Sequence, residues 1–282
     1  MLRFLSFLTA SVIIALVGLF ISSGGNWYRT VDRAWMATRY LNQELHYRLG
    51  YQLPGTPDLF RLGERLKVAG LKRGDPIFIR IFKSELALEL WMKHGEHYVL
   101  FASYPICYWS GQLGPKLKVG DHQAPEGFYT VSKGQLNPNS HWFRAFDVGF
   151  PNLFDREHGR TGSLLMVHGG CSSVGCYAMT NGVISEVWDL VTAALDAGQE
   201  RFAVDIFPFR LTEARLAAYK DHPSAGFWRE LKPGYDLFEA THTPPQISVC
   251  RGQYVAGSGA VEAISAPALR SNCPTAGQPA QS

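Results

Sequence analysis

The sequence predicts a mainly β fold with added helices, of the α+β class. From residue 76 onward, short runs rich in β-branched and aromatic residues recur, separated by turns rich in glycine and proline. An amphipathic helical pattern then covers residues 183–195, and shorter helical segments follow it. Closely spaced strands with such punctuation are typical of a sandwich or a barrel.

The composition is that of a globular protein. The chain has 282 residues, of which 46% are hydrophobic and 18% charged, so there is ample material for a core. The net charge of +3 is spread without a basic block, which gives no support for nucleic-acid binding. Seven Trp and seventeen Phe suit a packed core and grooves that hold extended peptide or sugar.

The N-terminus predicts export. Arg3 precedes an uncharged run over residues 4–28, which is apolar as far as Ile21. We expect residues 1–28 to be a signal peptide or a membrane anchor, and both alternatives stay open. The arginines that follow would hold this flank in the cytoplasm by the positive-inside rule. We nevertheless expect a periplasmic protein, because the chemistry of the site described below fits an external substrate.

Residues 29–75 are expected to form a helical lead-in to the main domain. Leucines recur at helical spacing on either side of a break at Pro54, Gly55 and Pro57.

The main domain is expected to span residues 76–248. Its first strand is predicted over residues 77–82. Leu86, Leu88, Leu90 and Met92 then alternate with other residues, as in a half-buried strand. Further strands are predicted over residues 98–104, 128–131, 143–148, 163–167 and 201–207.

The helical pattern at 183–195 has recognisable ends. Thr180 or Asn181 can cap its start, and Gly198 can end it. Short helices are predicted over 212–219 and 224–231. Residues 249–282 are rich in Gly, Ala, Ser and Pro, so we expect a flexible tail that does not pack.

The segment His168–Tyr177 is the densest chemical signal in the chain. It reads His-Gly-Gly-Cys-Ser-Ser-Val-Gly-Cys-Tyr and lies between an apolar run and the amphipathic helix. Cysteine attacks as a thiolate, and a nearby imidazole or helix N-terminus promotes its formation. We therefore predict Cys176 as a nucleophile and His168 as its base. Gly175 allows a tight turn beside the sulfur, and the N–H groups of Gly175, Cys176 and Tyr177 could hold an oxyanion.

Other interpretations of these cysteines stay open. The chain has five cysteines, so at least one is free or pairs with another molecule. His168, Cys171 and Cys176 could bind zinc, Cys171 and Cys176 could form a disulfide, or both thiols could be buried and inert. Cys107 lies in an apolar stretch and is expected to be a core residue. The remaining cysteines, Cys250 and Cys273, could form a disulfide near the C-terminus.

The motif resembles the L,D-transpeptidase catalytic domain (YkuD-type), and within it the YafK-like branch. That branch carries His-Gly-x-Cys-x-Ser-x-Gly-Cys-Tyr-Ala-Met, which is matched here by His168–Met179 with Ser173 at the serine position. Other matching stretches lie at residues 104–107, 114–116, 124–129, 136–140, 149–152 and 206–210. The resemblance covers residues 72–245.

The resemblance implies a β-sandwich with the nucleophile loop between a strand and a helix. It implies Cys176 and His168 as catalytic residues, with Gly175, Tyr177, Ser173 and Gly169 as oxyanion or supporting residues. No metal or organic cofactor is required.

The resemblance also implies a substrate. Cys176 would attack a carbonyl of a peptidoglycan stem peptide, form a thioester and pass the acyl group to an amine or to water. Many members of the wider family have a His and an Arg where this chain has Val174 and Ala178, which puts ordinary cross-linking in doubt. The YafK-like branch implies hydrolysis of the bond between a Braun-type lipoprotein and peptidoglycan. A non-catalytic wall-binding module is the rival from another class.

A further group is needed to orient His168. The candidates are a backbone carbonyl and four nearby side chains, Asp147, Asp155, Glu157 and His158. Arg156 and Arg160 could bind a stem carboxylate or serve solubility.

Overall fold

Two five-stranded sheets form the centre of the protein. The computed structural model describes residues 27–257, 269–271 and 273. The first sheet has the order β3-β2-β1-β10-β5 and the second the order β4-β9-β8-β7-β6. The strands of the first sheet are β1 (Ile77–Phe82), β2 (Ala87–His94), β3 (His97–Pro105), β5 (Gly127–Ser132) and β10 (Arg201–Phe207). Those of the second are β4 (Tyr108–Trp109), β6 (Leu136–Asn137), β7 (Ala145–Asp147), β8 (Met166–His168) and β9 (Tyr177–Ala178). The predicted α+β class is confirmed.

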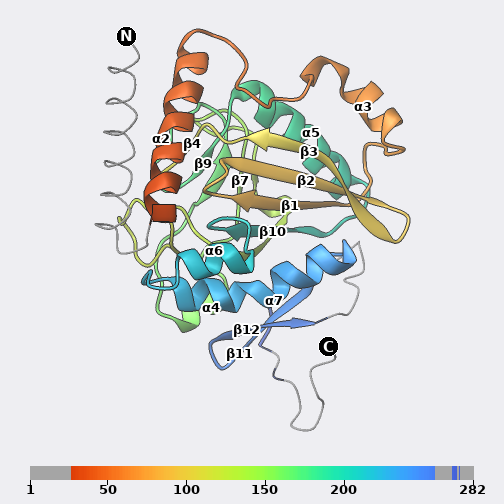
Figure 1. The fold of residues 1–282 in the computed structure, drawn as a ribbon. Coiled ribbons are helices and arrows are strands. Elements are labelled where there is room, and N and C mark those ends of the chain that lie inside the picture. Colours follow the sequence, from red (N-terminus) through yellow and green to blue (C-terminus); the bar gives the residue numbers. More distant parts are fainter. Residues whose placement is uncertain (1–26, 258–268, 272, 274–282) are drawn as a thin grey trace, which may run out of the picture.

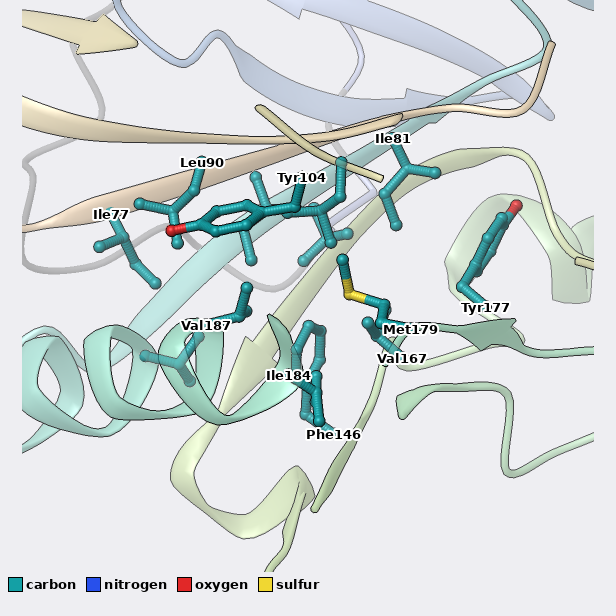
Figure 2. Close-up of a cluster of buried hydrophobic side chains, with 14 of the residues drawn as sticks. Ile77, Ile81, Leu90, Tyr104, Phe146, Val167, Tyr177, Met179, Ile184 and Val187 are labelled. Carbon is teal, nitrogen blue, oxygen red and sulfur yellow. The ribbon is translucent and has the colours of Figure 1, made fainter. Parts of the chain in front are cut away.

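The main core lies between these sheets and helix α5 (Asn181–Asp196) (Figure 1). Figure 2 shows Ile77, Ile81 and Leu90 of the first sheet above Phe146 and Val167 of the second. Ile184 and Val187 of α5 close the cluster from one side. Burial of such side chains contributes about 1.5–3 kcal/mol each, so the core fixes the position of the second sheet, which carries the predicted site.

The other face of the first sheet is covered by helix α7 (Ala225–Thr241). The ring of Phe238 lies 4.7 Å from that of Phe78, centroid to centroid. Strand β2 has the predicted alternation, with Leu88 and Leu90 in the core, but its opposite side is also buried, at Glu89. Helix α7 extends well beyond the predicted segment 224–231 and continues through Pro233, because its face packs on the sheet over its whole length.

Helix α5 begins and ends as its sequence indicates. The Thr180 hydroxyl accepts a hydrogen bond from the Val183 N–H at 3.3 Å and caps the start. The helix ends at Asp196, and Gly198 follows with a φ of 108°. This left-handed conformation costs glycine least and lets the chain turn into β10.

The lead-in segment contains helix α2 (Trp27–Arg48), the 3₁₀ turn η1 (Leu59–Arg61) and helix α3 (Leu62–Val68). Helix α2 runs along the side of the molecule where β4 and β9 lie (Figure 1). Among the described residues, we find no helix with the length and hydrophobicity needed to cross a bilayer. The uncharged run predicted to be an export segment lies outside the described residues, apart from Trp27 and Tyr28.

The expected tail begins with packed structure, which corrects our expectation for residues 249–257. Strands β11 (Gln246–Cys250) and β12 (Gln253–Gly257) form a hairpin. Tyr254 of β12 stacks on Phe154, with centroids 4.1 Å apart, in the short helix α4 (Leu153–Glu157). A disulfide joins Cys250 to Cys273, as the sequence had suggested. The small residues of this region therefore gave the wrong prediction, because Ile247 and Tyr254 pack the hairpin against the core. Most of the remaining tail lies outside the described residues.

Candidate active site

His168 and Cys176 occupy the same face of the second sheet. Strands β8 and β9 are parallel, with Val167 opposite Tyr177 and His168 opposite Ala178. Val167 and Tyr177 point into the core. Side chains alternate between faces along a strand, so His168, Ala178 and the preceding Cys176 all point away from that core. The short loop between the two strands thus returns the thiol to the side of the sheet that bears the imidazole.

The backbone carbonyl of Gly169 orients the His168 ring. Nδ1 lies 2.6 Å from this oxygen. A carbonyl only accepts hydrogen bonds, so Nδ1 carries the hydrogen and Nε2 has the free lone pair that a base needs. The ring is only 3% exposed, and the Trp142 ring lies 6.1 Å from it, centroid to centroid. Burial lowers the pKa of His168, and the Gly169 hydrogen bond opposes this in part. The imidazole is therefore neutral near pH 7.

The Cys176 sulfur lies against the backbone that leads into β8. Sγ accepts a hydrogen bond from the Met166 N–H at 3.3 Å and donates to the Leu164 carbonyl at 3.7 Å. Burial raises the pKa of the thiol; the Met166 N–H opposes the rise, Asp147 adds to it and Lys116 opposes it. The resting protein therefore holds a neutral thiol and a neutral imidazole on the same face of the sheet. For this sulfur to act as a nucleophile, it would have to lose its proton as it attacks.

Hydroxyl groups hold the backbone around the nucleophile. The Gly175 N–H donates to the hydroxyl of buried Ser110, and the Cys176 N–H donates to Ser173 Oγ at 2.8 Å. Ser173 Oγ in turn donates to the Cys176 carbonyl at 2.7 Å. Both N–H groups are thus engaged, so an oxyanion hole that used them would require the loop to move. The supporting role predicted for Gly175 and Ser173 has a structural basis, whereas the oxyanion role stays a prediction.

Tyr177 anchors the loop to the core. Its phenol donates a hydrogen bond to the Pro125 carbonyl at 2.6 Å, and its side chain is 1% exposed. Its hydroxyl therefore serves packing, and only the backbone of this residue adjoins the nucleophile.

Gly169 is needed because the chain passes very close to its neighbours. A Cβ at this position would lie 2.5 Å from Asn181 Oδ1 and 3.0 Å from the Trp142 carbonyl oxygen. Asn181 Oδ1 also accepts a hydrogen bond from the Gly170 N–H at 3.0 Å. The first turn of α5 and the segment around Trp142 thus clamp the two glycines that follow His168.

A disulfide between Cys107 and Cys171 decides among the open interpretations of the cysteines. It excludes a bridge from Cys171 to Cys176, and it removes Cys171 as a thiolate ligand for zinc. No cluster of metal-binding side chains is found among the described residues. Cys176 is the free thiol, since Cys250 and Cys273 form the other bridge. Cys107 is buried as expected, but the sequence did not predict that it forms a disulfide with Cys171 of the loop before Cys176.

The acidic side chains proposed to orient His168 have other partners. Asp155 is buried and pairs with Arg160, Nη1 to Oδ1 at 2.8 Å. Glu157 accepts from the Gly252 N–H at 2.8 Å. Asp147 lies opposite Met166 and so shares the face of Cys176, but its Oδ1 accepts from the Gly149 N–H at 2.8 Å. The carbonyl alternative is the one that the structure supports.

The two remaining side chains near α4 are structural. The His158 ring stacks on Phe154, centroid to centroid at 4.1 Å. Arg156 donates to the Pro151 carbonyl at 2.5 Å. Neither this arginine nor Arg160, which is held by Asp155, lies among the groups that contact Cys176 or His168. Sequence reasoning missed the contribution of Ser110, Lys116 and Trp142, which come from loops distant in the chain; Lys116 lies in a matching stretch, but nothing in that stretch pointed to Cys176.

The arrangement defines an α+β protein with one free thiol and one oriented imidazole on a common sheet face. No family model matches the chain. Two proteins of Escherichia coli, from strain K12 and from O157:H7, are each 49% identical over 199 residues, which is 71% of this chain and 81% of theirs. Both are named "Putative L,D-transpeptidase YafK". The chain belongs to the YafK-like L,D-transpeptidase family.

Solved structures show weaker similarity. The helical cell shape determining protein Pgp2 from Campylobacter jejuni is 20% identical, with a TM-score of 0.39 over 62% of this chain and 65% of that one. Bd1075 from Bdellovibrio bacteriovorus is 22% identical, with a TM-score of 0.35 over 58% of this chain and 60% of that one. Similarity of this extent carries no functional assignment.

Proposed function

We propose that this protein is a periplasmic cysteine acyl enzyme that acts on peptide bonds of peptidoglycan stems. The observation that carries the proposal is the placement of His168, in β8, and Cys176, directly before the parallel strand β9, on one face of the sheet. Among five cysteines, Cys176 is the free one. The family to which the chain belongs is named for acyl transfer between stem peptides, which agrees with a thiol and a base in this arrangement.

His168 serves as the base in the proposed reaction. As Sγ of Cys176 attacks the substrate carbonyl carbon, Nε2 of His168 takes the thiol proton. The tetrahedral intermediate collapses, the C–N bond breaks, and the leaving amine takes the proton from His168. A thioester on Cys176 remains. An amine or water then attacks it, gives a proton to His168, and the thiol is restored when the C–S bond breaks and sulfur is reprotonated.

Hydrolysis of a lipoprotein linkage is the second candidate. Ala178 lies between Tyr108 of β4 and His168 of β8 and is 0% exposed. An arginine at this position would project onto the face of the nucleophile and offer a charge to a substrate carboxylate, whereas alanine offers none. Its absence favours water over a second stem peptide as acceptor. A Braun-type lipoprotein attached to peptidoglycan would then be the substrate.

Two features favour the proposed location. Disulfides form and persist in oxidising compartments such as the periplasm, and this chain has two bridges. The uncharged N-terminal run is suited to export, as a cleaved signal or as an anchor. Fractionation of cells that express a tagged full-length chain checks the location, and a cytoplasmic thiol-reduced protein would contradict it.

Incubation with purified sacculi tests the function. The wild-type protein should release or transfer stem peptides, and Cys176→Ala should abolish this without a change in fold. Val174→Ala is the matched control, because its side chain is 70% exposed on the same loop. Cross-linked products indicate transfer, and free stems or released lipoprotein indicate hydrolysis. Activity that survives in Cys176→Ala would refute the assignment, and sacculus binding without turnover would favour a wall-binding module.

A further inference from the structure

A cavity of about 480 Å³ lies between helix α2, strand β4 and the end of helix α6 (Glu213–Ala218). Its lining residues come from three distant parts of the chain, which are helix α2, the segment 108–113 and the segment that follows α6. The groups that give it its chemical character are Arg33 and Tyr40 of α2, Tyr108, Gln112 and His222.

The cavity adjoins the candidate active site through strand β4. Tyr108 lies opposite Ala178, and Ala178 lies opposite His168, so the three occupy one row across the sheet. Neighbouring strands are about 4.8 Å apart, which puts the Tyr108 backbone about 10 Å from that of His168. Ser110, next to the cavity wall, accepts the hydrogen bond of Gly175 beside the nucleophile. A separation of this size is within the length of an extended substrate of a few residues.

Long-range contacts fix the width of the cavity. Asp32 of α2 accepts hydrogen bonds from Arg215 at 2.9 Å and from the Tyr219 hydroxyl at 2.8 Å, which joins α2 to α6. The Tyr40 hydroxyl donates to the Trp109 carbonyl at 3.3 Å, which joins α2 to β4. Because both sides of α2 are tied down, the cavity is a preformed space.

Its floor is equally rigid. The carbonyl of Gln112 accepts a hydrogen bond at 3.0 Å from Lys83, a fully buried side chain. Gly111 has a φ of 94° and lies very close to Gln123. A Cβ added to Gly111 would lie 2.2 Å from Oε1 of Gln123. Such construction is expected of a binding site, where groups are held in place before the ligand arrives.

Arg33 gives the cavity a charge preference. The described salt bridges of α2 use Asp32 with Arg215 and Glu44 with Arg48, which leaves Arg33 without a carboxylate partner among the described residues. Aromatic rings line the space beside it, with Tyr40 and Tyr108 centroids 5.3 Å apart. A guanidinium next to aromatic surface suits a carboxylate on an aliphatic stem.

We propose that this cavity is the subsite for the amine component of the reaction, and that Arg33 recognises its carboxylate. The amine component is the leaving group in hydrolysis and the acceptor in transfer, so the inference rests on the proposed function. An amino acid whose side-chain amine forms the bond and whose α-carboxylate is free meets both requirements.

Binding to the Cys176→Ala protein tests the subsite without turnover. The probe is a fluorescein-labelled Ala-Ala-Lys peptide, which has a side-chain amine and a free carboxylate, and its partner is the C-terminal amide of the same peptide. Fluorescence anisotropy should show tighter binding of the acid by about threefold to tenfold, as expected for a partly solvated charged contact. Arg33→Gln should remove this preference and Arg33→Lys should restore part of it.

Arg48→Gln is the matched control, because Arg48 lies on the same helix with its side chain 75% exposed. It should leave the acid preference unchanged. Equal binding of acid and amide, or a preference that survives in Arg33→Gln, would overturn the subsite. A third outcome is also informative. If the preference for the acid depends on Arg33 but the wild-type protein does not act on sacculi, the subsite is retained and the proposed function is refuted.

Discussion

Cys107 and Cys171 are joined by a disulfide that ties the segment between β3 and β4 to the loop that presents Cys176. The bridge spans 64 positions in the sequence, and its Cα atoms lie 5.2 Å apart. The loop that carries the nucleophile is therefore fixed at Cys171, near its start, and again at Gly175, through Ser110.

Removal of this bridge should lower both stability and activity. A closed loop of this length stabilises the fold by about 4 kcal/mol in the chain-entropy account. We expect Cys107→Ala/Cys171→Ala to lose roughly this amount in denaturant unfolding, and to lose turnover per folded molecule because the loop is released.

The other disulfide provides the control. Cys250→Ala/Cys273→Ala opens a loop with a sequence separation of 23, which begins at the end of β11 in the C-terminal hairpin. It should cost about 3 kcal/mol of stability but leave turnover per folded molecule unchanged. Equal losses of turnover in the two double variants would show that the loop does not depend on its own bridge.

The sequence predicted the features that are encoded by neighbouring residues, but not the Cys107–Cys171 bridge, which joins distant ones. The short range of the motif made Cys176 and His168 recognisable, and the Thr180 cap of α5 is encoded locally in the same way. Cys107 gave no such signal, because its partner lies far along the chain and is chosen by the packing of β4 against β9. A backbone carbonyl was among the candidates to orient His168, but the sequence could not indicate Gly169 in particular, since every residue has a carbonyl.

The pH dependence of thiol reactivity should reveal a neutral resting pair. Burial raises the pKa of Cys176 and lowers that of His168, so no thiolate–imidazolium pair forms at rest. The rate of alkylation by iodoacetamide should therefore keep rising above about pH 8.5, the pKa of a free thiol, without a plateau at low pH.

The pH dependence of turnover should follow the protonation of His168 rather than that of Cys176. In the proposed reaction turnover requires neutral His168, so the acid limb of kcat/KM should fall below about pH 6.5, the pKa of free imidazole. His168→Gln should abolish turnover yet change the alkylation profile little. A plateau of alkylation below pH 7 that vanishes in His168→Gln would mean that an ion pair exists at rest.

Gly169→Ala should damage the site by steric overlap alone. Gly169 does not adopt a positive φ, so alanine is compatible with its backbone, but the added Cβ would meet Asn181, Trp142 and Phe143 at 2.5–3.1 Å. We expect a loss of about 1–3 kcal/mol of stability and a larger relative loss of kcat, because the carbonyl of Gly169 orients His168. Thermal unfolding and steady-state kinetics measure the two effects.

Gly134→Ala is the control for that substitution, because a Cβ there has open space and the residue has no positive φ. It should behave as wild type. Normal kinetics in Gly169→Ala would show that the clamp around the two glycines has no influence on the imidazole.

Lys83→Met should cost far more than its distance from the nucleophile suggests. Its ammonium donates at 3.0 Å to the carbonyls of Gln112, Gly114 and Ala124 and to Glu126 Oε1. Burial lowers the pKa of Lys83, and the nearby carboxylate of Glu126 opposes this shift. Both side chains are 0% exposed, so methionine would strand a buried carboxylate, at a cost of about 3–5 kcal/mol in urea unfolding.

Two further variants separate the charge from the packing. Lys133→Met breaks an exposed pair with Asp196 and should cost less than about 1 kcal/mol. Lys83→Met/Glu126→Gln removes the stranded charge. Its single amide oxygen can accept from only one of the two donors, the Gly114 N–H at Oε1 or the Trp228 Nε1–H at Oε2, so it should recover only part of the loss. If the double variant is no more stable than Lys83→Met, the three carbonyl contacts rather than the ion pair hold the 112–126 loop. That loop forms the floor of the cavity beside α2, so acid selectivity in peptide binding should weaken in step with stability.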